Sequence, residues 1–439
     1  MRVELTALGI GALGIAASLP LAAASPVTFT KDVAPILYQR CAECHRPGQT
    51  APMPLLSFEQ ARPWAKAIRE KVLEGAMPPW LAAPGHGKFE NERRLPRREV
   101  ETLVAWVDGG AMRGNDKDLP PLPKFEEGWT LGKPDAVIAL PDEVGVPADG
   151  VVPYKYITAL THFTEDHWIQ AAEIRPGNRG VVHHVIVFVR DAAAAAAPAA
   201  SAPPAAAARD GAVRESAADE GGSLRGLVKL AGFAPGEQPK VYPAGTAKLV
   251  KAGASLVFQM HYTPNGTAAT DRTYIGLFFA REPVRRKVLT ATATNRSFVI
   301  PAGDANYEVR SSWTAKEDVR IVDLMPHMHY RGKDFRYTAV FPDGRSEVIL
   351  DVPKYDFNWQ LLYRFQSAFV LPQGGRIDCV AHFDNSPRNR YNPDPGKDVR
   401  WGPQTWEEMM IGWFDYTLEA EDLTRPAAAA LTSPASSRP

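Results

Sequence analysis

The chain has only 3 cysteines in 439 residues, no net charge, and no long apolar stretch beyond its N-terminus. So few cysteines cannot form the dense disulfide framework of a small secreted scaffold. The 50 basic residues are balanced by 50 acidic ones, so no basic field is present and we expect no nucleic-acid partner. After residue 25, no segment approaches the ~20 uninterrupted apolar residues of a membrane-spanning helix.

The N-terminal stretch is MRVELTALGIGALGIAASLPLAAAS. One arginine is followed by an apolar run and then by small residues, which is the pattern of a secretory signal peptide. We therefore predict a signal peptide over residues 1–25. The mature protein is expected to be periplasmic or secreted, with no transmembrane anchor after leader cleavage.

Residues 26–115 have a helical pattern. The stretch SFEQARPWAKAIREKVLEGA has apolar residues at helical spacing and begins with a capping pattern at Ser57 and Gln60. A second amphipathic helix, RREVETLVAWVDGGA, is closed by Gly109 and Gly110. The following proline-rich residues 116–129 are predicted to be a linker.

From about residue 130 the pattern changes to short apolar or alternating runs separated by Gly, Pro, Asn and Asp clusters. This pattern predicts β-sandwich domains, and the length of the region favours two of them, over 130–290 and 291–425. The first contains an Ala- and Pro-rich stretch, 191–223, which we expect to be a disordered insertion. The tail over 426–439 is expected to be disordered as well.

The sequence CAECH at residues 41–45 has the spacing of a covalent c-type haem attachment site. Cys41 and Cys44 would bond the two vinyl groups, and His45 would be the proximal ligand of the iron. A four-cysteine zinc site is excluded because the chain has no second cysteine pair.

The second axial ligand of the haem is expected downstream. Met77 follows the long predicted helix in the turn EGAMPPW, and a thioether ligand suits electron transfer. Met53 is the alternative, and His86 is a weaker one. Together with the MPPW turn and a closing helix that carries Trp106, this segment resembles small bacterial class I cytochrome c domains.

Five histidines lie in strand-like surroundings. His183 and His184 are adjacent in VVHHVIVF, His261 ends LVFQMHY, and His327 and His329 occur in LMPHMHYRG. Because side chains alternate along a strand, the last two point the same way, about 7 Å apart along the backbone. That spacing is suitable for one metal ion.

The adjacent pair poses a geometric problem. Neighbouring residues of a regular strand point to opposite faces, so His183 and His184 could share a metal only at a bulge or a strand end. Gly180, just upstream, makes such an irregularity plausible.

Histidine-rich sets without carboxylates suit copper or zinc, and a thioether ligand selects copper. TWEEMMIGWFDY supplies Met409 and Met410 late in the chain. Met325 shares the face of the later histidine pair by alternation and is an alternative ligand. Cys379 and His382 in CVAHF form a less favoured set.

In this order, VVHHVIVF, LVFQMHY, HMHYRGK and TWEEMMIGWFDY resemble motifs of the copper type II monooxygenases, the dopamine β-hydroxylase and peptidylglycine hydroxylating monooxygenase group. The resemblance spans roughly residues 130–420. It implies two jelly-roll β-sandwiches that hold one copper each across a solvent-filled cleft. The expected fold is thus a small all-α cytochrome c domain followed by two all-β jelly-roll domains.

The resemblance also implies ligands and chemistry. The ligands of the family's electron-transfer copper correspond to His183, His184 and His261. The ligands of its dioxygen-binding copper correspond to His327, His329 and Met409. We accordingly expect an exported enzyme with two copper ions and one haem c that hydroxylates a C–H bond of a small organic substrate with dioxygen. Electrons would come from an external donor, ascorbate or a periplasmic redox carrier, and pass through the haem. The alternative is an exported copper- and haem-binding redox, electron-transfer or sensor protein without oxygenase turnover.

The substrate end departs from the family. Peptide-hydroxylating members hold a substrate carboxylate with an Arg, an Asn and a Tyr, whereas the matching positions here are Met325, Ile411 and Trp413. A carboxylate buried against these side chains would be unpaired, at a cost of several kcal/mol. The sequence therefore predicts an apolar and aromatic substrate pocket.

Overall fold

The computed structural model describes residues 26–425, except for 50, 126–127, 193–226 and 235–237. The expected signal peptide, nearly all of the expected insertion and the tail lie outside the described residues. Within the described part of the chain, no helix is both long and apolar enough to cross a membrane.

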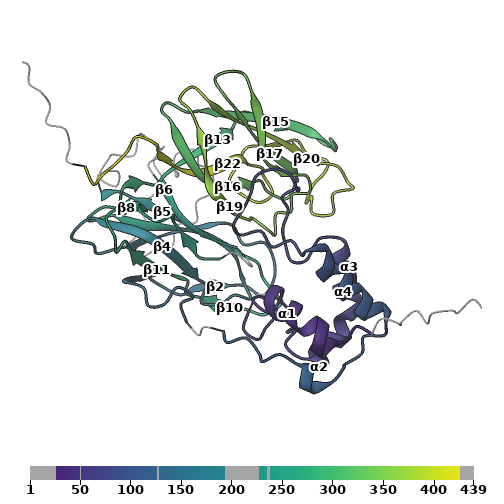
Figure 1. The fold of residues 1–439 in the computed structure, drawn as a ribbon. Coiled ribbons are helices and arrows are strands. Elements are labelled where there is room, and N and C mark those ends of the chain that lie inside the picture. The colour runs from purple at the N-terminus through teal and green to yellow at the C-terminus, as the bar shows by residue number, and fades with distance from the viewer. Residues whose placement is uncertain (1–25, 50, 126–127, 193–226, 235–237, 426–439) are drawn as a thin grey trace, which may run out of the picture.

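Short helices make up the N-terminal segment (Figure 1). The Ser57 hydroxyl accepts a hydrogen bond from the Gln60 backbone N–H at 3.3 Å, which confirms the predicted cap. The predicted helix after it is interrupted at Arg62–Trp64, because Pro63 lacks an N–H and disfavours helical geometry in the residue before it. The elements are η1 (Phe29–Val33), α1 (Ala34–Arg40), α2 (Phe58–Ala61), η2 (Arg62–Trp64), α3 (Ala65–Leu73), α4 (Arg97–Asp108) and η3 (Asp116–Asp118).

The expected fold is wrong, because this segment is not a separate small all-α domain and the described chain is mostly β-sheet. The chain between α3 and α4 leaves the helices and enters the second sandwich. There Trp80 and Phe89 are part of the sandwich's hydrophobic core. The Glu90 N–H donates to the Arg364 carbonyl at 2.9 Å, and Phe89 forms a bridge with Phe365. The segment between the helices therefore shares a hydrophobic core and backbone hydrogen bonds with the second sandwich, which an independent domain would not do.

The first β-sandwich encloses a core of aliphatic and aromatic side chains contributed by both of its main sheets. Its edge strands are short, and a small two-stranded sheet lies beside them. One sheet has the order β1 (Ala136–Ala139), β11 (Tyr274–Phe279), β4 (His167–Arg175), β8 (Thr246–Val250), β12 (Arg286–Lys287), with β7 (Lys240–Val241) paired to β4. The other has the order β3 (Lys155–Leu160), β9 (Ser255–Tyr262), β5 (Val182–Arg190), β6 (Leu227–Phe233), and the small sheet pairs β10 (Ala269–Asp271) with β2 (Val144–Val146).

The second β-sandwich lies above the first in Figure 1 and has a larger, more aromatic core. Its two main sheets have four strands each. One has the order β13 (Leu289–Asn295), β22 (Met410–Leu418), β16 (Val319–His327), β19 (Tyr363–Leu371). The other has the order β15 (Tyr307–Thr314), β20 (Arg376–Phe383), β17 (Gly332–Val340), β18 (Ser346–Val352), and β14 (Val299–Ile300) pairs with β21 (Val399–Arg400).

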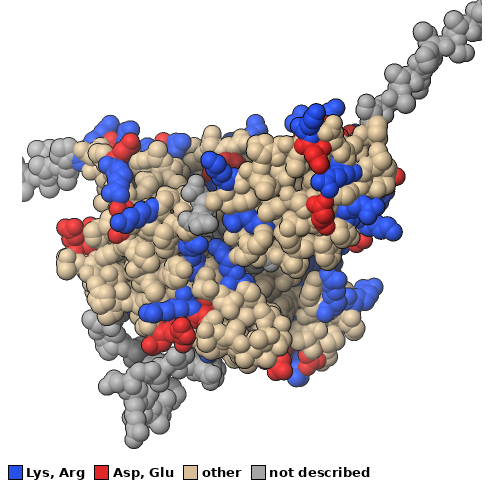
Figure 2. All heavy atoms as spheres, turned by 90° about the horizontal axis from the view of Figure 1, so that it is seen from below, with Lys and Arg blue, Asp and Glu red and all other residues tan. Residues whose placement is uncertain are grey.

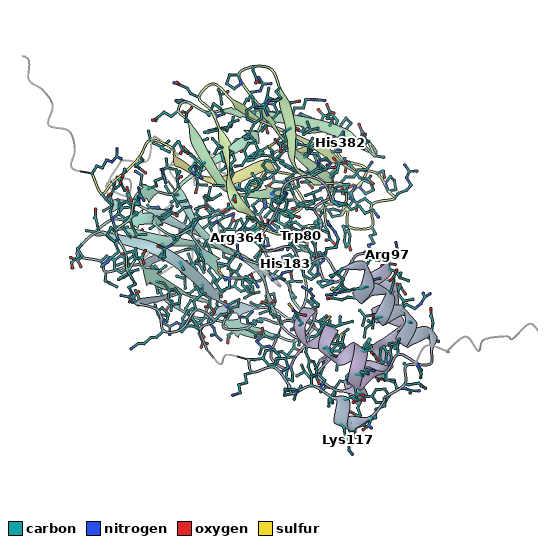
Figure 3. The ribbon with its side chains drawn as sticks, in the orientation of Figure 1. Trp80, Arg97, Lys117, His183, Arg364 and His382 are labelled. Carbon is teal, nitrogen blue, oxygen red and sulfur yellow. The ribbon has the colours of Figure 1, made fainter. Side chains whose placement is uncertain are left out.

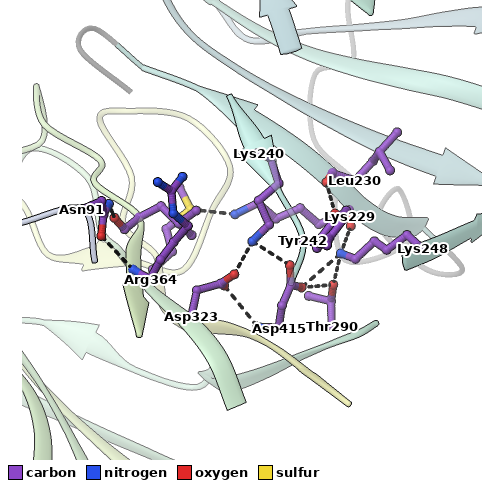
Figure 4. Close-up of polar contacts among 12 residues, drawn as sticks. Asn91, Lys229, Leu230, Lys240, Tyr242, Lys248, Thr290, Asp323, Arg364 and Asp415 are labelled. Carbon is purple, nitrogen blue, oxygen red and sulfur yellow. Dashed lines mark hydrogen bonds and ion pairs between the residues drawn. The ribbon is translucent and has the colours of Figure 1, made fainter. Parts of the chain in front are cut away.

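A buried ionic cluster joins the two sandwiches (Figure 4). Lys240 of β7 forms ion pairs with Asp323 of β16 and with Asp415 of β22, the second at 3.0 Å. Lys248 of β8 forms an ion pair with Asp415 at 3.0 Å and donates to the Thr290 hydroxyl at 2.6 Å. Because lysines of one sandwich neutralise aspartates of the other, the cluster fixes how the two sandwiches meet.

Basic and acidic side chains are interspersed over the face of the molecule seen in Figure 2. Such a face offers no broad single-sign surface to a polyanion.

Candidate metal and haem sites

Three histidines of the first sandwich form one compact cluster. Ligand atoms of His183, His184 and His261 all lie within 4.8 Å of one another. The strand pairing of β5 with β9 shifts between Val182 and His184, which places a bulge at His183. The predicted irregularity is therefore confirmed, and it allows two adjacent side chains to face the same point.

His183 and His184 each have an outer partner on Nε2, and their Nδ1 atoms face each other. His183 Nε2 lies 3.3 Å from Asn358 Oδ1, and His184 Nε2 lies 3.1 Å from the Tyr154 hydroxyl. Their two Nδ1 atoms are 3.0 Å apart, and the buried Nδ1 of His261 has no hydrogen-bond partner among the described residues. Such a group of imidazole nitrogens suits a copper or a zinc ion.

Burial keeps these imidazoles neutral, as metal ligation requires. It lowers the pKa of His183, and it lowers the pKa values of His184 and His261 well below the ordinary range, with further lowering from neighbouring histidines. The cluster is therefore prepared to bind a cation at neutral pH without first losing protons.

His327 ends strand β16, and His329 lies just beyond it, with ring centroids 5.2 Å apart. The His327 Nδ1–H donates to Gln360 Oε1 at 2.6 Å, and the His329 Nδ1–H donates to the Glu407 carbonyl at 3.1 Å. Both Nε2 atoms are thereby left for a metal. Burial lowers the pKa of His327 to about 4 and that of His329 to about 3, so both rings are neutral.

The methionines near this pair differ in their surroundings. Met410 packs in the core of the second sandwich, and its sulfur accepts a hydrogen bond from the Ser311 hydroxyl at 3.1 Å. The sulfur of Met325 accepts from Lys229 Nζ at 2.6 Å. Met409 is buried two residues before Ile411, which is paired with His327. Met409 directly precedes β22, so it lies close in sequence to the strand position that faces His327.

The less favoured set is not assembled. Cys379 is fully buried in the core of the second sandwich. His382, three residues further along β20, instead bonds Asp334 at 2.7 Å and lies 3.5 Å from Glu308. With an odd separation on one strand, the two side chains face opposite sides.

The two histidine sets lie close together rather than across a solvent-filled cleft. The Tyr154 ring centroid is 4.9 Å from that of His261 and 6.4 Å from that of His329. Phe357 is similarly placed, at 5.8 Å from His261 and 6.1 Å from His329. Aromatic rings that touch both sets occupy this space, so the expected cleft is replaced here by packed side chains.

A lysine lies beside Met325 and Trp413, two of the positions where the carboxylate clamp is missing. Lys229 of β6 reaches them from the first sandwich and donates to Met325, with its Nζ also 5.7 Å above the Trp413 ring. The prediction of an apolar and aromatic pocket did not include this lysine, which comes 96 residues before Met325.

The CAECH residues fold into one turn after α1. The His45 N–H donates to the Cys41 carbonyl at 2.9 Å, and the Cys44 N–H donates to the same carbonyl at 3.1 Å. The His45 Nδ1–H donates to the Met53 carbonyl at 3.1 Å, which leaves Nε2 for an iron. This geometry places both thiols and the imidazole together, as a covalent haem attachment needs.

A cavity of about 510 Å³ opens beside this turn and is lined by Cys41, Cys44, His45 and Met77. The size is typical of a cofactor pocket. Met53 packs against the core of the helices instead, and neither it nor His86 is among the residues that line the cavity. Of the three residues considered as a second ligand, Met77 is therefore the one that lines the cavity beside the CAECH turn.

The same cavity reaches both sandwiches, because His183, Asn358 and Trp359 also line it. Figure 3 labels His183 where the helices and the two sandwiches meet. We refer to this space as the haem cavity. Its wall includes one histidine of the metal cluster, so the two candidate sites are neighbours.

Sequence reasoning missed the segment Tyr355–Gln360, which lies between β18 and β19. The Tyr355 hydroxyl bonds the Met328 carbonyl at 2.8 Å, and the next residues reach both histidine sets and the haem cavity. No metal-ligand pattern marks YDFNWQ in the sequence. Its aromatic and amide residues were the only available signal.

Comparisons with known proteins give little. No protein-family model and no curated protein match the chain. T=1 particles derived from infectious bursal virus align at 10% identity and a TM-score of 0.20, over 61% of this chain and 56% of that one. This chain thus spans little more than half of that relative's length. Oxalate decarboxylase from Bacillus subtilis aligns at 9% identity and a TM-score of 0.13, over 69% and 81% of the two chains. Likenesses this weak carry no argument about fold or function.

Proposed function

We propose that this chain is an exported copper-dependent monooxygenase that hydroxylates a C–H bond of a small organic substrate, with electrons relayed through a covalently bound haem c. The observation that carries the proposal is the meeting of three candidate redox sites. The two histidine sets contact the same aromatic rings, Tyr154 and Phe357, and His183 also lines the haem cavity.

His183, His184 and His261 would hold one copper ion, and His327, His329 and Met409 would hold the other. When bound, copper supplies the redox chemistry by which one atom of dioxygen is inserted into a C–H bond. The other atom leaves as water, so each turnover consumes two electrons and two protons from outside.

The protein's own residues would hold the ligands and exclude water. Gln360 and the Glu407 carbonyl orient the rings of His327 and His329, which are 5% and 1% exposed. This burial keeps both imidazoles neutral and dry, which favours a reduced copper and protects the reaction from side reactions with water. A small organic substrate would have to reach this region past the contacts of Tyr154, Phe357 and Lys229.

Cys41, Cys44, His45 and Met77 would hold the haem. A haem c with methionine ligation carries one electron at a time at a relatively high potential. Its cavity borders His183, which supports a path from an external donor, ascorbate or a periplasmic redox carrier, through the haem to the first histidine set.

The experiment that tests the proposal combines composition with turnover. Purified protein, exported through its own N-terminal segment, is expected to contain one haem c by absorption and two coppers by metal analysis. The reduced, copper-loaded protein should consume dioxygen in a substrate-dependent manner and release a hydroxylated product. One zinc or no copper per chain, or dioxygen uptake that no organic compound stimulates, would contradict it.

A second candidate function is a copper- and haem-binding electron-transfer or sensor protein without oxygenase turnover. It is favoured by the burial of His327 and His329 behind aromatic rings, because a substrate must also enter there. Full metal loading and haem-to-copper electron transfer, with no product from any substrate class, would support this candidate instead.

A further inference from the structure

One short segment of the second sandwich connects the haem cavity with the first histidine set. Asn358 and Trp359 line the cavity. Asn358 Oδ1 lies 3.3 Å from His183 Nε2, and the Phe357 ring is stacked on the His183 ring with centroids 5.3 Å apart and an angle of 11°. His183 is thus held from two sides by residues 175 and 174 positions later in the chain.

The Asn358 side chain is fixed by a third residue. Its backbone N–H and its Nδ2 both donate to Asp356 Oδ1, each at 2.9 Å. Because the amide nitrogen is occupied in this way, the amide oxygen is the atom left to face His183. That oxygen can only accept, so His183 Nε2 carries the proton, and Nδ1, which lies 3.0 Å from His184 Nδ1, is the nitrogen that could bind a metal.

His183 differs from the other two members of its set in position. It lines the haem cavity and is partly exposed, whereas His184 and His261 are 2% and 4% exposed and are not among the described residues that line the cavity. Electron transfer slows steeply as the gap between donor and acceptor widens. A path through a bonded ring and one hydrogen bond is therefore preferred over a path through packed side chains.

We propose that His183 is the point at which the first histidine set receives electrons from the haem, and that Asn358 is the positioning residue that makes this possible. The inference rests on the proposed binding of haem and copper, and it adds the route between them. The step moves one electron: the ferrous haem becomes ferric, the cupric ion becomes cuprous, and no atom or proton is transferred. A one-electron donor outside the protein then restores the ferrous haem.

The test uses the full-length, haem- and copper-loaded protein without substrate or dioxygen. The haem is reduced rapidly, and its reoxidation is followed by absorption while the cupric EPR signal is followed in parallel. In the unchanged protein, both signals should decay together at a rate independent of protein concentration. Asn358→Leu should slow this rate on the order of tenfold to a hundredfold, the range typical of residues that orient a metal ligand.

Three further variants separate a positioning role from a structural one. Asn358→Gln keeps both the acceptor oxygen and the donor nitrogen of the amide and should retain the unchanged rate within a few-fold. Asp356→Ala releases the amide without touching His183 and should slow the transfer, which also covers the case that Asn358→Leu fails to fold. Asn306→Leu, an exposed asparagine elsewhere in the second sandwich, is the matched control and should have no effect. Both midpoint potentials are measured, so that a rate change is not mistaken for a change in driving force.

A rate unaltered in both Asn358→Leu and Asp356→Ala, with copper still bound, would overturn the inference. This failure is distinguishable from failure of the proposed function. Transfer that depends on Asn358 in a protein that hydroxylates nothing supports the route and contradicts the oxygenase. Hydroxylation by a protein whose electron-transfer rate does not depend on Asn358 supports the oxygenase and contradicts the route.

Discussion

The Nδ1 atoms of His183 and His184 lie 3.0 Å apart, although the two residues are neighbours on one strand. In a regular strand their side chains would point to opposite faces. The bulge at His183 turns both rings toward His261. At this distance one neutral ring can donate an N–H to the other, or both nitrogens can face a shared cation. With His261 beside them, the local geometry could hold a metal ion.

The first prediction concerns metal removal. Copper bound by this cluster stabilises the folded state, by about 2.7 kcal/mol when free copper is a hundredfold above its dissociation constant. Chelator should lower the melting temperature, and copper should restore it. His261→Ala should reduce this copper-dependent rise, and the part that remains comes from the second set. His167→Ala serves as the control, because His167 stacks on Phe279 outside the cluster. A copper-dependent rise as large in His261→Ala as in His167→Ala would contradict the assignment.

The second prediction separates the methionines. Met409→Ala should reduce the copper content from two ions per chain to one and abolish turnover, with little change in haem absorption. Met410→Ala should keep both coppers but lower the free energy of unfolding by about 2–5 kcal/mol, because it leaves a cavity in the core. Metal analysis and urea unfolding of the two variants provide the comparison. Loss of copper in Met410→Ala, or its retention in Met409→Ala, would reverse the assignment of the third ligand.

The strands and the bulge were predictable from the sequence because their causes are local. A short apolar run bounded by turn residues indicates a strand, and the run that ends at Tyr262 was recognised in this way. The adjacent histidines required an irregularity if they were to share a metal, and the register shift at His183 supplies it.

The prediction of an independent helical domain was wrong because the contacts that join this segment to the second sandwich are not local in sequence. Trp80 and Phe89 follow a helix and are ordinary aromatic residues in the sequence. Their partners in the second sandwich, such as Tyr363 and Phe365, come more than 270 residues later. The contact between Asn358 and His183 spans 175 residues and was missed for the same reason. Periodicity says which face of an element is buried, but not against what.

The third prediction concerns the ionic cluster between the sandwiches. Lys240→Met leaves two aspartates buried with one lysine fewer, and breaking a buried pair in this way costs about 3–5 kcal/mol. Urea unfolding should show this loss. The double variant Lys240→Met/Asp323→Leu should recover part of it, because it removes the uncompensated charge as well. Arg97→Met breaks only the exposed pair with Glu101 and should leave the stability unchanged. Equal stability of Lys240→Met and Arg97→Met would show that the cluster contributes nothing.

The fourth prediction concerns acid, and it sets the two aspartates of the cluster against each other. Burial raises the pKa of Asp415, but Lys248 and Lys240 together lower it by more than burial raises it. The net pKa is therefore below the ordinary value. The folded state therefore binds this proton less readily than the unfolded chain, whose aspartates titrate at about 3.9. The stabilisation is fully present above about pH 4 and is lost as the pH falls below it.

Asp323 has the opposite sign, because burial outweighs its ion pair with Lys240 and raises its pKa. The folded state thus binds this proton more readily than the unfolded chain, so protonation of Asp323 stabilises the folded state as the pH falls. Urea unfolding at a series of pH values from about 6 to 3 should show that Asp415→Asn, although less stable at neutral pH, loses less stability in acid than the unchanged protein. Asp323→Asn should lose at least as much. The exposed Asp343→Asn is the control and should follow the unchanged protein. If Asp323→Asn were the variant protected from acid, the balance of charges in the cluster would be the reverse of the one described.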